Sequence, residues 1–123
     1  MSSLPFKITV LLFAVSWAMP AIGNELESVQ DQFRTGKYAE AEAVAAETVE
    51  SGIWNERWPR LLIQLQLEQG KYAEALQTYE DAIRRYPTSM TLRMLGLEAI
   101  RFNNLSERAD EERKRFFQLL QSS

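Results

Sequence analysis

The chain has 123 residues, with 14 Lys and Arg against 17 Asp and Glu, and it contains neither His nor Cys. Without imidazole or thiol groups it can form no Ser-His-Asp triad, no Cys nucleophile, no zinc site with His or Cys ligands and no disulfide framework. A hydrophobic fraction of 46% beside a charged fraction of 25% is typical of a folded globular domain. The net charge of -3 gives no overall basic field to hold a nucleic acid, so we expect no nucleic acid partner.

Residues 1–23 have the layout of a secretory signal peptide. Lys7 precedes an apolar run from Ile8 to Met19, and small residues follow at Ala21 and Gly23. The run is well short of the roughly 20 residues that a helix needs to cross a bilayer, so we favour cleavage over a retained anchor. We expect cleavage after Gly23, with an alternative after Ala18. The mature chain would then be exported to the periplasm or secreted, with no membrane span left, and the lack of Cys favours a bacterial envelope.

A six-residue segment occurs twice in the remaining chain. The sequence GKYAEA stands at 36–41 and again at 70–75, a shift of 34 residues. A third shift reaches 104–109, where Asn104 replaces Gly and Ala109 is kept. Asn is the other residue that tolerates a left-handed backbone. A fixed period of this length is typical of stacked helical or other supersecondary units, and we expect one domain, 24–123, with units at about 24–55, 56–88 and 89–123.

Each unit is predicted to hold two helices. In the second unit Asn55 can cap a helix that ends at Gly70, and its apolar positions recur in steps of three and four residues: Trp58, Leu61, Leu62 and Leu65. A second apolar stripe leads towards Pro87: Tyr72, Ala75, Leu76, Tyr79, Ala82 and Ile83. Ala75 and Ala82 are small enough to let two helices approach closely. Thr88 or Ser89 is predicted to start the fifth helix and Ser106 the sixth, and no segment has the pattern of a strand.

The second unit resembles the tetratricopeptide repeat. The resemblance rests on a turn glycine, an aromatic, a small residue, a second aromatic, a second small residue and a closing proline: Gly70, Tyr72, Ala75, Tyr79, Ala82 and Pro87. The first unit matches less fully and the third is degenerate, with the positions Gly36, Tyr38, Ala41 and Ala109 kept. The resemblance implies an all-α solenoid of about three helix pairs.

Three departures from that family pattern concern positions between the units. Ala45 stands where the second aromatic is usual in the first unit, and Arg113 stands there in the third. The pair Leu95-Gly96 lies one residue out of register with the family's leucine and glycine. These departures leave the predicted fold unchanged, but they prevent a transfer of surface details from the family.

The resemblance implies a concave face, lined mainly by the first helix of each unit, that receives a peptide or helix of another protein. Projected onto this chain, that face presents Gln30, Arg34, Arg57, Arg60, Gln64, Glu68, Met94, Glu98, Arg101 and Phe102. Arginine beside aromatic residues suits a partner with carboxylates and apolar anchors. The alternative is that these are scattered surface charges beside core residues. Some family members clamp a C-terminal carboxylate with Lys and Asn, but Leu26, Gln30 and Leu95 occupy those places, which disfavours a receptor for chaperone tails.

The end of the chain is unusually apolar. Arg113-Lys114-Arg115 is followed by four large apolar residues, Phe116, Phe117, Leu119 and Leu120. We expect Phe116 and Leu120 to pack on the preceding hairpin and the other two to point elsewhere. We expect Asp110, Glu111 and Glu112 to neutralise the basic triplet from within one turn. A solenoid usually ends in a polar capping helix, so this end either docks a partner or a second copy, or belongs to the front part of a longer array.

Nothing in the sequence indicates catalysis. The acid pairs Glu40/Glu42 and Glu111/Glu112 fall on predicted helix surfaces and do not converge on a pocket. There is no glycine-rich phosphate loop. We therefore expect a non-catalytic adaptor without cofactor or metal that binds another protein in its groove. The alternative is a structural piece, the leading part of a longer solenoid or a self-associating scaffold, with no specific groove ligand.

Overall fold

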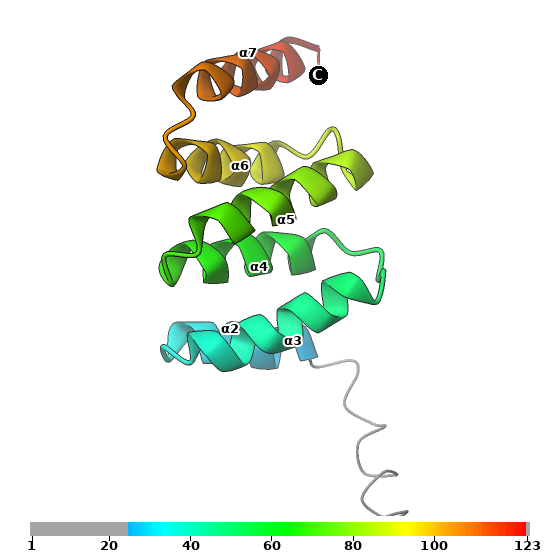
Figure 1. The fold of residues 1–123 in the computed structure, drawn as a ribbon. Coiled ribbons are helices and arrows are strands. Elements are labelled where there is room, and N and C mark those ends of the chain that lie inside the picture. Colours follow the sequence, from blue (N-terminus) through cyan, green and yellow to red (C-terminus); the bar gives the residue numbers. More distant parts are fainter. Residues whose placement is uncertain (1–24, 123) are drawn as a thin grey trace, which may run out of the picture.

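The computed structural model describes residues 25–122, which form six α-helices and no strand (Figure 1). Their bounds are α2 Glu25–Arg34, α3 Tyr38–Glu50, α4 Arg57–Glu68, α5 Tyr72–Arg85, α6 Met90–Phe102 and α7 Ser106–Ser122. The prediction of an all-α chain of helical hairpins is confirmed. The expected signal peptide lies outside the described residues.

The three turns inside the hairpins share one conformation. Gly36, Gly70 and Asn104 have positive φ angles of 81°, 74° and 59°. After each of them the next backbone N–H reaches back to a carbonyl five residues earlier: Lys37 to Gln32 at 2.8 Å, Lys71 to Gln66 at 2.8 Å, and Leu105 to Ile100 at 3.2 Å. This bond closes the carbonyl end of a helix over a left-handed residue. The prediction that Asn104 replaces a turn glycine is therefore confirmed.

Two predicted helix starts are also confirmed by capping bonds. The Asn55 side chain accepts from the Arg57 N–H at 3.0 Å, just before α4. The Ser89 hydroxyl accepts from the Leu92 N–H at 3.2 Å at the start of α6. Each side-chain oxygen satisfies a backbone donor that has no partner inside the helix.

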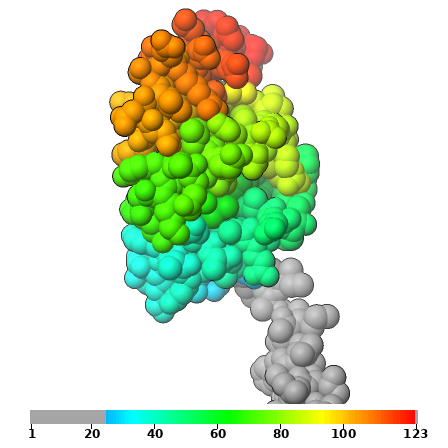
Figure 2. Space-filling model, viewed as in Figure 1, coloured from blue at the N-terminus to red at the C-terminus, as the bar shows by residue number. Residues whose placement is uncertain are grey.

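The hairpins α2/α3, α4/α5 and α6/α7 stack in a column, each on the one before (Figures 1 and 2). The backbone of α4 comes close to both α2 and α6, whereas α3 and α5, or α5 and α7, have no Cα atoms within 8 Å of one another. Neighbours on the inside of a curve are closer than those on the outside. The stack of described residues therefore curves with its first helices, α2, α4 and α6, on the inner side.

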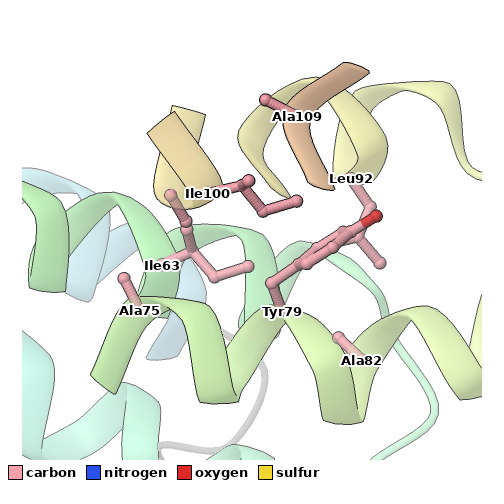
Figure 3. Packing of buried hydrophobic residues seen from close by; sticks show 8 residues of the cluster. Ile63, Ala75, Tyr79, Ala82, Leu92, Ile100 and Ala109 are labelled. Atoms are coloured by element: carbon pink, nitrogen blue, oxygen red, sulfur yellow. The ribbon is translucent and has the colours of Figure 1, made fainter. Parts of the chain in front are cut away.

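Two separate apolar clusters hold the stack together, one at each seam between hairpins. The first seam, between α2/α3 and α4/α5, contains Val29, Ala41, Ala45, Trp58, Leu61, Leu62 and Leu65. The second seam, between α4/α5 and α6/α7, contains Ile63, Ala75, Tyr79, Ala82, Leu92, Ala99, Ile100 and Ala109 (Figure 3). Ala75 is fully buried and Ala82 is 5% exposed, so the small residues lie at the close approach that the sequence predicts.

Tyr79 and Gly96 explain the family departure in the third unit. The Tyr79 ring reaches from α5 towards α6 and is 1% exposed (Figure 3). A Cβ atom placed on Gly96 would lie 2.2 Å from two ring carbons of Tyr79, which no side chain can tolerate. Gly96 therefore stands where the Tyr79 ring needs space.

The second seam also contains a buried ion pair that the sequence analysis placed at the surface. Glu112 is 6% exposed, and its Oε1 accepts from the Tyr79 hydroxyl at 2.5 Å and from Arg93 Nη1 at 2.5 Å. A second nitrogen of Arg93 donates to the carbonyl of Pro87 at 2.8 Å. Burial, with a smaller effect of the hydrogen bond to Glu112, raises the pKa of Tyr79 far above its usual range. The expectation that Glu112 neutralises the basic triplet was wrong, although Asp110 does pair with Arg113 at 2.8 Å.

The apolar end of α7 also departs from its prediction. Leu120, expected to pack on the preceding hairpin, is 49% exposed, whereas Leu119 is half-buried. The inward side of α7 runs through Ala109, Glu112, Phe116 and Leu119 in steps of three, four and three residues. This phase turns Phe117, 55% exposed, to the outside as expected.

Candidate partner-binding surfaces

The inner side of the stack carries two adjoining hollows between α4 and α6. One has a volume of about 390 Å³ and is lined by Phe33, Gln64, Leu67, Glu68, Leu95, Glu98 and Phe102. The other, of about 380 Å³, is lined by Gln64, Thr91, Met94, Leu95, Leu97, Glu98 and Arg101. Because they share Gln64, Leu95 and Glu98, the two hollows form one depression, called the inner groove below.

The aromatic wall of the inner groove is held in place by the repeat itself. The ring of Phe102 stacks on Tyr72 with 4.7 Å between centroids and 9° between planes. The next residue, Asn103, donates from its side-chain amide to the carbonyls of Tyr72 at 2.8 Å and Ala99 at 2.7 Å. Phe102 remains 49% exposed, so it presents apolar surface in a fixed position.

The charges of the inner groove are available to a ligand. Glu68, Glu98 and Arg101 are exposed, and none of them has an ion pair within residues 25–122. The hollow beside Phe33 and Phe102 carries the two carboxylates, and no basic side chain is among the described residues that line it. The single base of the groove, Arg101, lines the other hollow.

The structure brings together part of the predicted surface. Six predicted residues line the inner groove: Gln64, Glu68, Met94, Glu98, Arg101 and Phe102. The other four, Gln30, Arg34, Arg57 and Arg60, line neither hollow. Arg34 pairs with Asp31 on its own helix, and Arg60 approaches Glu56 at 3.8 Å. The groove therefore has fewer arginines than the sequence suggested.

The sequence analysis missed the apolar floor of the groove. Phe33, Leu67 and Leu95 are half-buried and line the hollow beside Phe102. Leu95 precedes Phe102 by seven residues, the spacing of two helical turns, so an extension of the helical period from Phe102 could have found it.

A second hollow, called the outer hollow, lies between α3 and α5. It has a volume of about 330 Å³, and most of its lining is apolar: Ala46, Val49, Ile53, Pro59, Leu62, Ala82 and Tyr86, with Glu50, Thr78, Asp81 and Arg85. Trp54 lies next to this hollow, 69% exposed, with its ring 5.2 Å from that of Tyr86 and 4.4 Å from the Arg85 guanidinium. The sequence analysis did not single out this surface. The adjacent apolar pair Ile53-Trp54 in a connection between helices was the available signal.

An ion pair across the first seam fixes the turn between α4 and α5. Lys71 Nζ lies 2.8 Å from Glu42 Oε1, which also accepts from the Gln69 side chain at 2.8 Å. The hydrogen bond to Glu42 raises the pKa of Lys71 above its usual value. Glu42, predicted on a helix surface with Glu40, thus has a structural partner.

Residues 25–122 offer little to a metal ion or a bilayer. They contain no group of three or more Asp or Glu side chains placed to hold a metal ion. None of their helices has both the length and the hydropathy that crossing a membrane requires.

Comparison with known proteins gave one family match. The model of the tetratricopeptide repeat family matches residues 26–89 and again residues 60–111. The first match spans α2 to α5, and the second runs from α4 into α7. No curated protein matched the sequence.

Proposed function

The chain belongs to the tetratricopeptide repeat family, whose members generally mediate protein–protein interactions, and from that premise we propose that its inner groove holds a peptide or helix of a partner protein. One observation carries the proposal. The inner groove combines a fixed, half-exposed aromatic ring with an apolar floor and three charges that have no ion pair in the described chain. Binding sites are typically concave and apolar, with a few polar groups that orient the ligand.

The groove favours a ligand of mixed character. An apolar side chain fits between Phe33 and Phe102, and a basic side chain beside it would meet Glu68 and Glu98. An acidic group further along would meet Arg101. The sequence suggested a partner rich in carboxylates, but the arginines that carried that expectation line neither hollow. A basic residue next to an apolar anchor is therefore the chemistry we propose.

We propose a non-catalytic role for this groove. Its carboxylates are exposed and flank an open depression, where water lowers their capacity for acid–base catalysis. The members of this family typically act as interaction modules.

A peptide selection tests the groove directly. We would pan a random peptide library on the full chain and measure the affinity of selected peptides by fluorescence anisotropy. Phe102→Ala and Glu98→Lys should each weaken binding about tenfold or more, because each removes a central contact. Phe117→Ala and Glu47→Lys are matched controls on other surfaces, with circular dichroism to verify the fold. Unchanged affinity in both groove variants would exclude this site.

We also propose that the chain is exported. The support is the sequence of residues 1–23 alone, a charged start, a short apolar run and small residues before Asn24. Expression of the full chain in a bacterial host, with fractionation and N-terminal sequencing, tests this. A mature terminus at Asn24 in the envelope or medium is expected, and recovery from the cytoplasm with Met1 or Ser2 first would contradict it.

A further inference from the structure

The outward side of the last hairpin corresponds, residue by residue, to a surface that is covered elsewhere in the molecule. A shift of 34 residues carries Ile83 and Tyr86 of α5 onto Phe117 and Leu120 of α7. Ile83 and Tyr86 are half-buried and pack against the cluster that includes Leu92, Ala99 and Ile100 of α6. Phe117 is 55% exposed, and Leu120 is 49% exposed.

The same shift relates the neighbouring first helices. Ile63 is fully buried in the second seam and Leu67 packs against it, and their equivalents in α6 are Leu97 and Arg101. Between α6 and α7 lies a notch of about 310 Å³, with Arg101, Ala109, Asp110 and Arg113 in its lining. Figure 2 shows α7, orange to red, as the last layer of the column, with no other described part of the chain above it. The notch and Phe117 are therefore placed where the next first helix of the stack would lie.

The charges around this end face point to the chemistry of its occupant. Arg101, Arg113 and Lys114 surround it, with Asp110 as the acid among them, and Asp110 pairs with Arg113 at 2.8 Å. Arg101 and Lys114 have no ion pair within the described residues. Acidic side chains beside an apolar stripe would complement this surface.

A second copy of the chain is a poor occupant. In a head-to-tail stack the face of α2 would take the place that α6 has in the second seam, and shifting back from Gly96, Ala99 and Ile100 gives Ser28, Asp31 and Gln32. That face is polar and cannot cover Phe117. A tail-to-tail pair would bring Arg113 and Lys114 of both copies together, and like charges repel.

We propose that the end face formed by Leu97, Arg101, Arg113 and Phe117 docks an acidic amphipathic helix of a partner protein, which completes the stack as its next layer. This surface is distinct from the inner groove. It would give the protein a second interaction site, at the end of the column.

A peptide copied from the chain itself tests the proposal, because α6 covers the equivalent surface of the second seam. The probe is a fluorescent peptide of residues 89–103 carrying Arg93→Glu and Arg101→Glu, which makes it acidic and keeps its apolar stripe. We expect it to bind the full chain, and the unchanged 89–103 peptide to bind about threefold or more weakly. A version of the acidic peptide with Leu92→Gln and Ile100→Gln should not bind.

Variants of the full chain locate the peptide. Phe117→Glu should weaken binding about tenfold or more, and Lys114→Glu about twofold to threefold. Trp54→Glu and Lys37→Glu are controls with the same changes of charge elsewhere, and Phe102→Ala separates this site from the inner groove; all three should bind as the parent does. Absence of binding by the acidic peptide, or equal binding to the Phe117→Glu variant, would overturn the proposal. So would analytical ultracentrifugation that shows a dimer of the full chain abolished by Phe117→Glu, because a second copy would then be the occupant.

Discussion

The two seams of the stack use the same positions with large and small residues exchanged. In the first seam Ala45 and Leu62 are buried, with 0% and 4% of their surface exposed. Thirty-four residues later, the second seam has Tyr79 in place of Ala45 and Gly96 in place of Leu62. One seam therefore has its bulk on the first helix and the other on the second helix, which conserves the volume across the seam.

The exchange explains two departures from the family pattern together. A missing aromatic at Ala45 and a glycine out of register at Gly96 look unrelated in the sequence. In the structure each is one half of a large–small pair. The second seam also lies beneath the inner groove, between α4 and α6, so its rigidity keeps Phe102 in place over the groove floor.

Removal of the Tyr79 ring should have the largest effect on stability. Tyr79→Ala deletes a fully buried aromatic, which costs about 3–5 kcal/mol of unfolding free energy. Urea denaturation followed by circular dichroism measures the loss. The matching change in the first seam, Leu62→Ala, should cost about 2–4 kcal/mol. A loss below about 1 kcal/mol for Tyr79→Ala would show that the ring does not bear on the seam.

The buried ion pair distinguishes the second seam from the first. Glu112→Gln keeps a side-chain oxygen for the Tyr79 hydroxyl but leaves the Arg93 guanidinium without its carboxylate. We expect a loss of about 2–3 kcal/mol, the range for a buried hydrogen bond to a charged group. Glu111→Gln, on the exposed side of the same helix, is the control and should change stability by less than about 0.5 kcal/mol. Equal effects of the two substitutions would mean that Glu112 is solvated in solution.

A methyl group at Gly96 tests the large–small exchange more sharply. Gly96→Ala places a Cβ 2.2 Å from the Tyr79 ring and should cost about 1–3 kcal/mol through overpacking. In a Tyr79→Ala background the same change should be neutral or stabilising, because the ring that it meets is gone. The coupling energy from the double-mutant cycle is the measurement. Additive effects would refute the direct contact.

The smallest expected effect is a loss of stability at alkaline pH. The folded-state pKa of Tyr79 and that of Lys71 are both raised, so the stabilisation is complete below about pH 10 and decreases as the pH rises further. Tyr79→Phe should reduce the dependence from the second seam, and Lys71→Met that from the first. Denaturation midpoints between pH 8 and 11 provide the test. A parent protein that becomes more stable over this range would contradict the sign.

The sequence predicted the features that repeat and missed those that depend on stacking. The period of 34 residues predicted the hairpins and the left-handed turn at Asn104. Glu112 next to a basic triplet has the pattern of a surface residue, and its burial requires Arg93 and Tyr79, which approach it only once the hairpins stack. The inner groove was predicted in part, since the helical period located Phe102 and Glu98 but not their apolar neighbours.

The measurement that tests the proposed function most directly is methyl NMR of the full chain during titration with a peptide selected for binding. Our account predicts that the methyl signals of Leu67 and Leu95 in the inner groove shift with the bound fraction. Those of Val49 and Ile53 in the outer hollow should stay in place. Shifts confined to Val49 and Ile53 would contradict the account and assign recognition to the outer hollow beside Trp54.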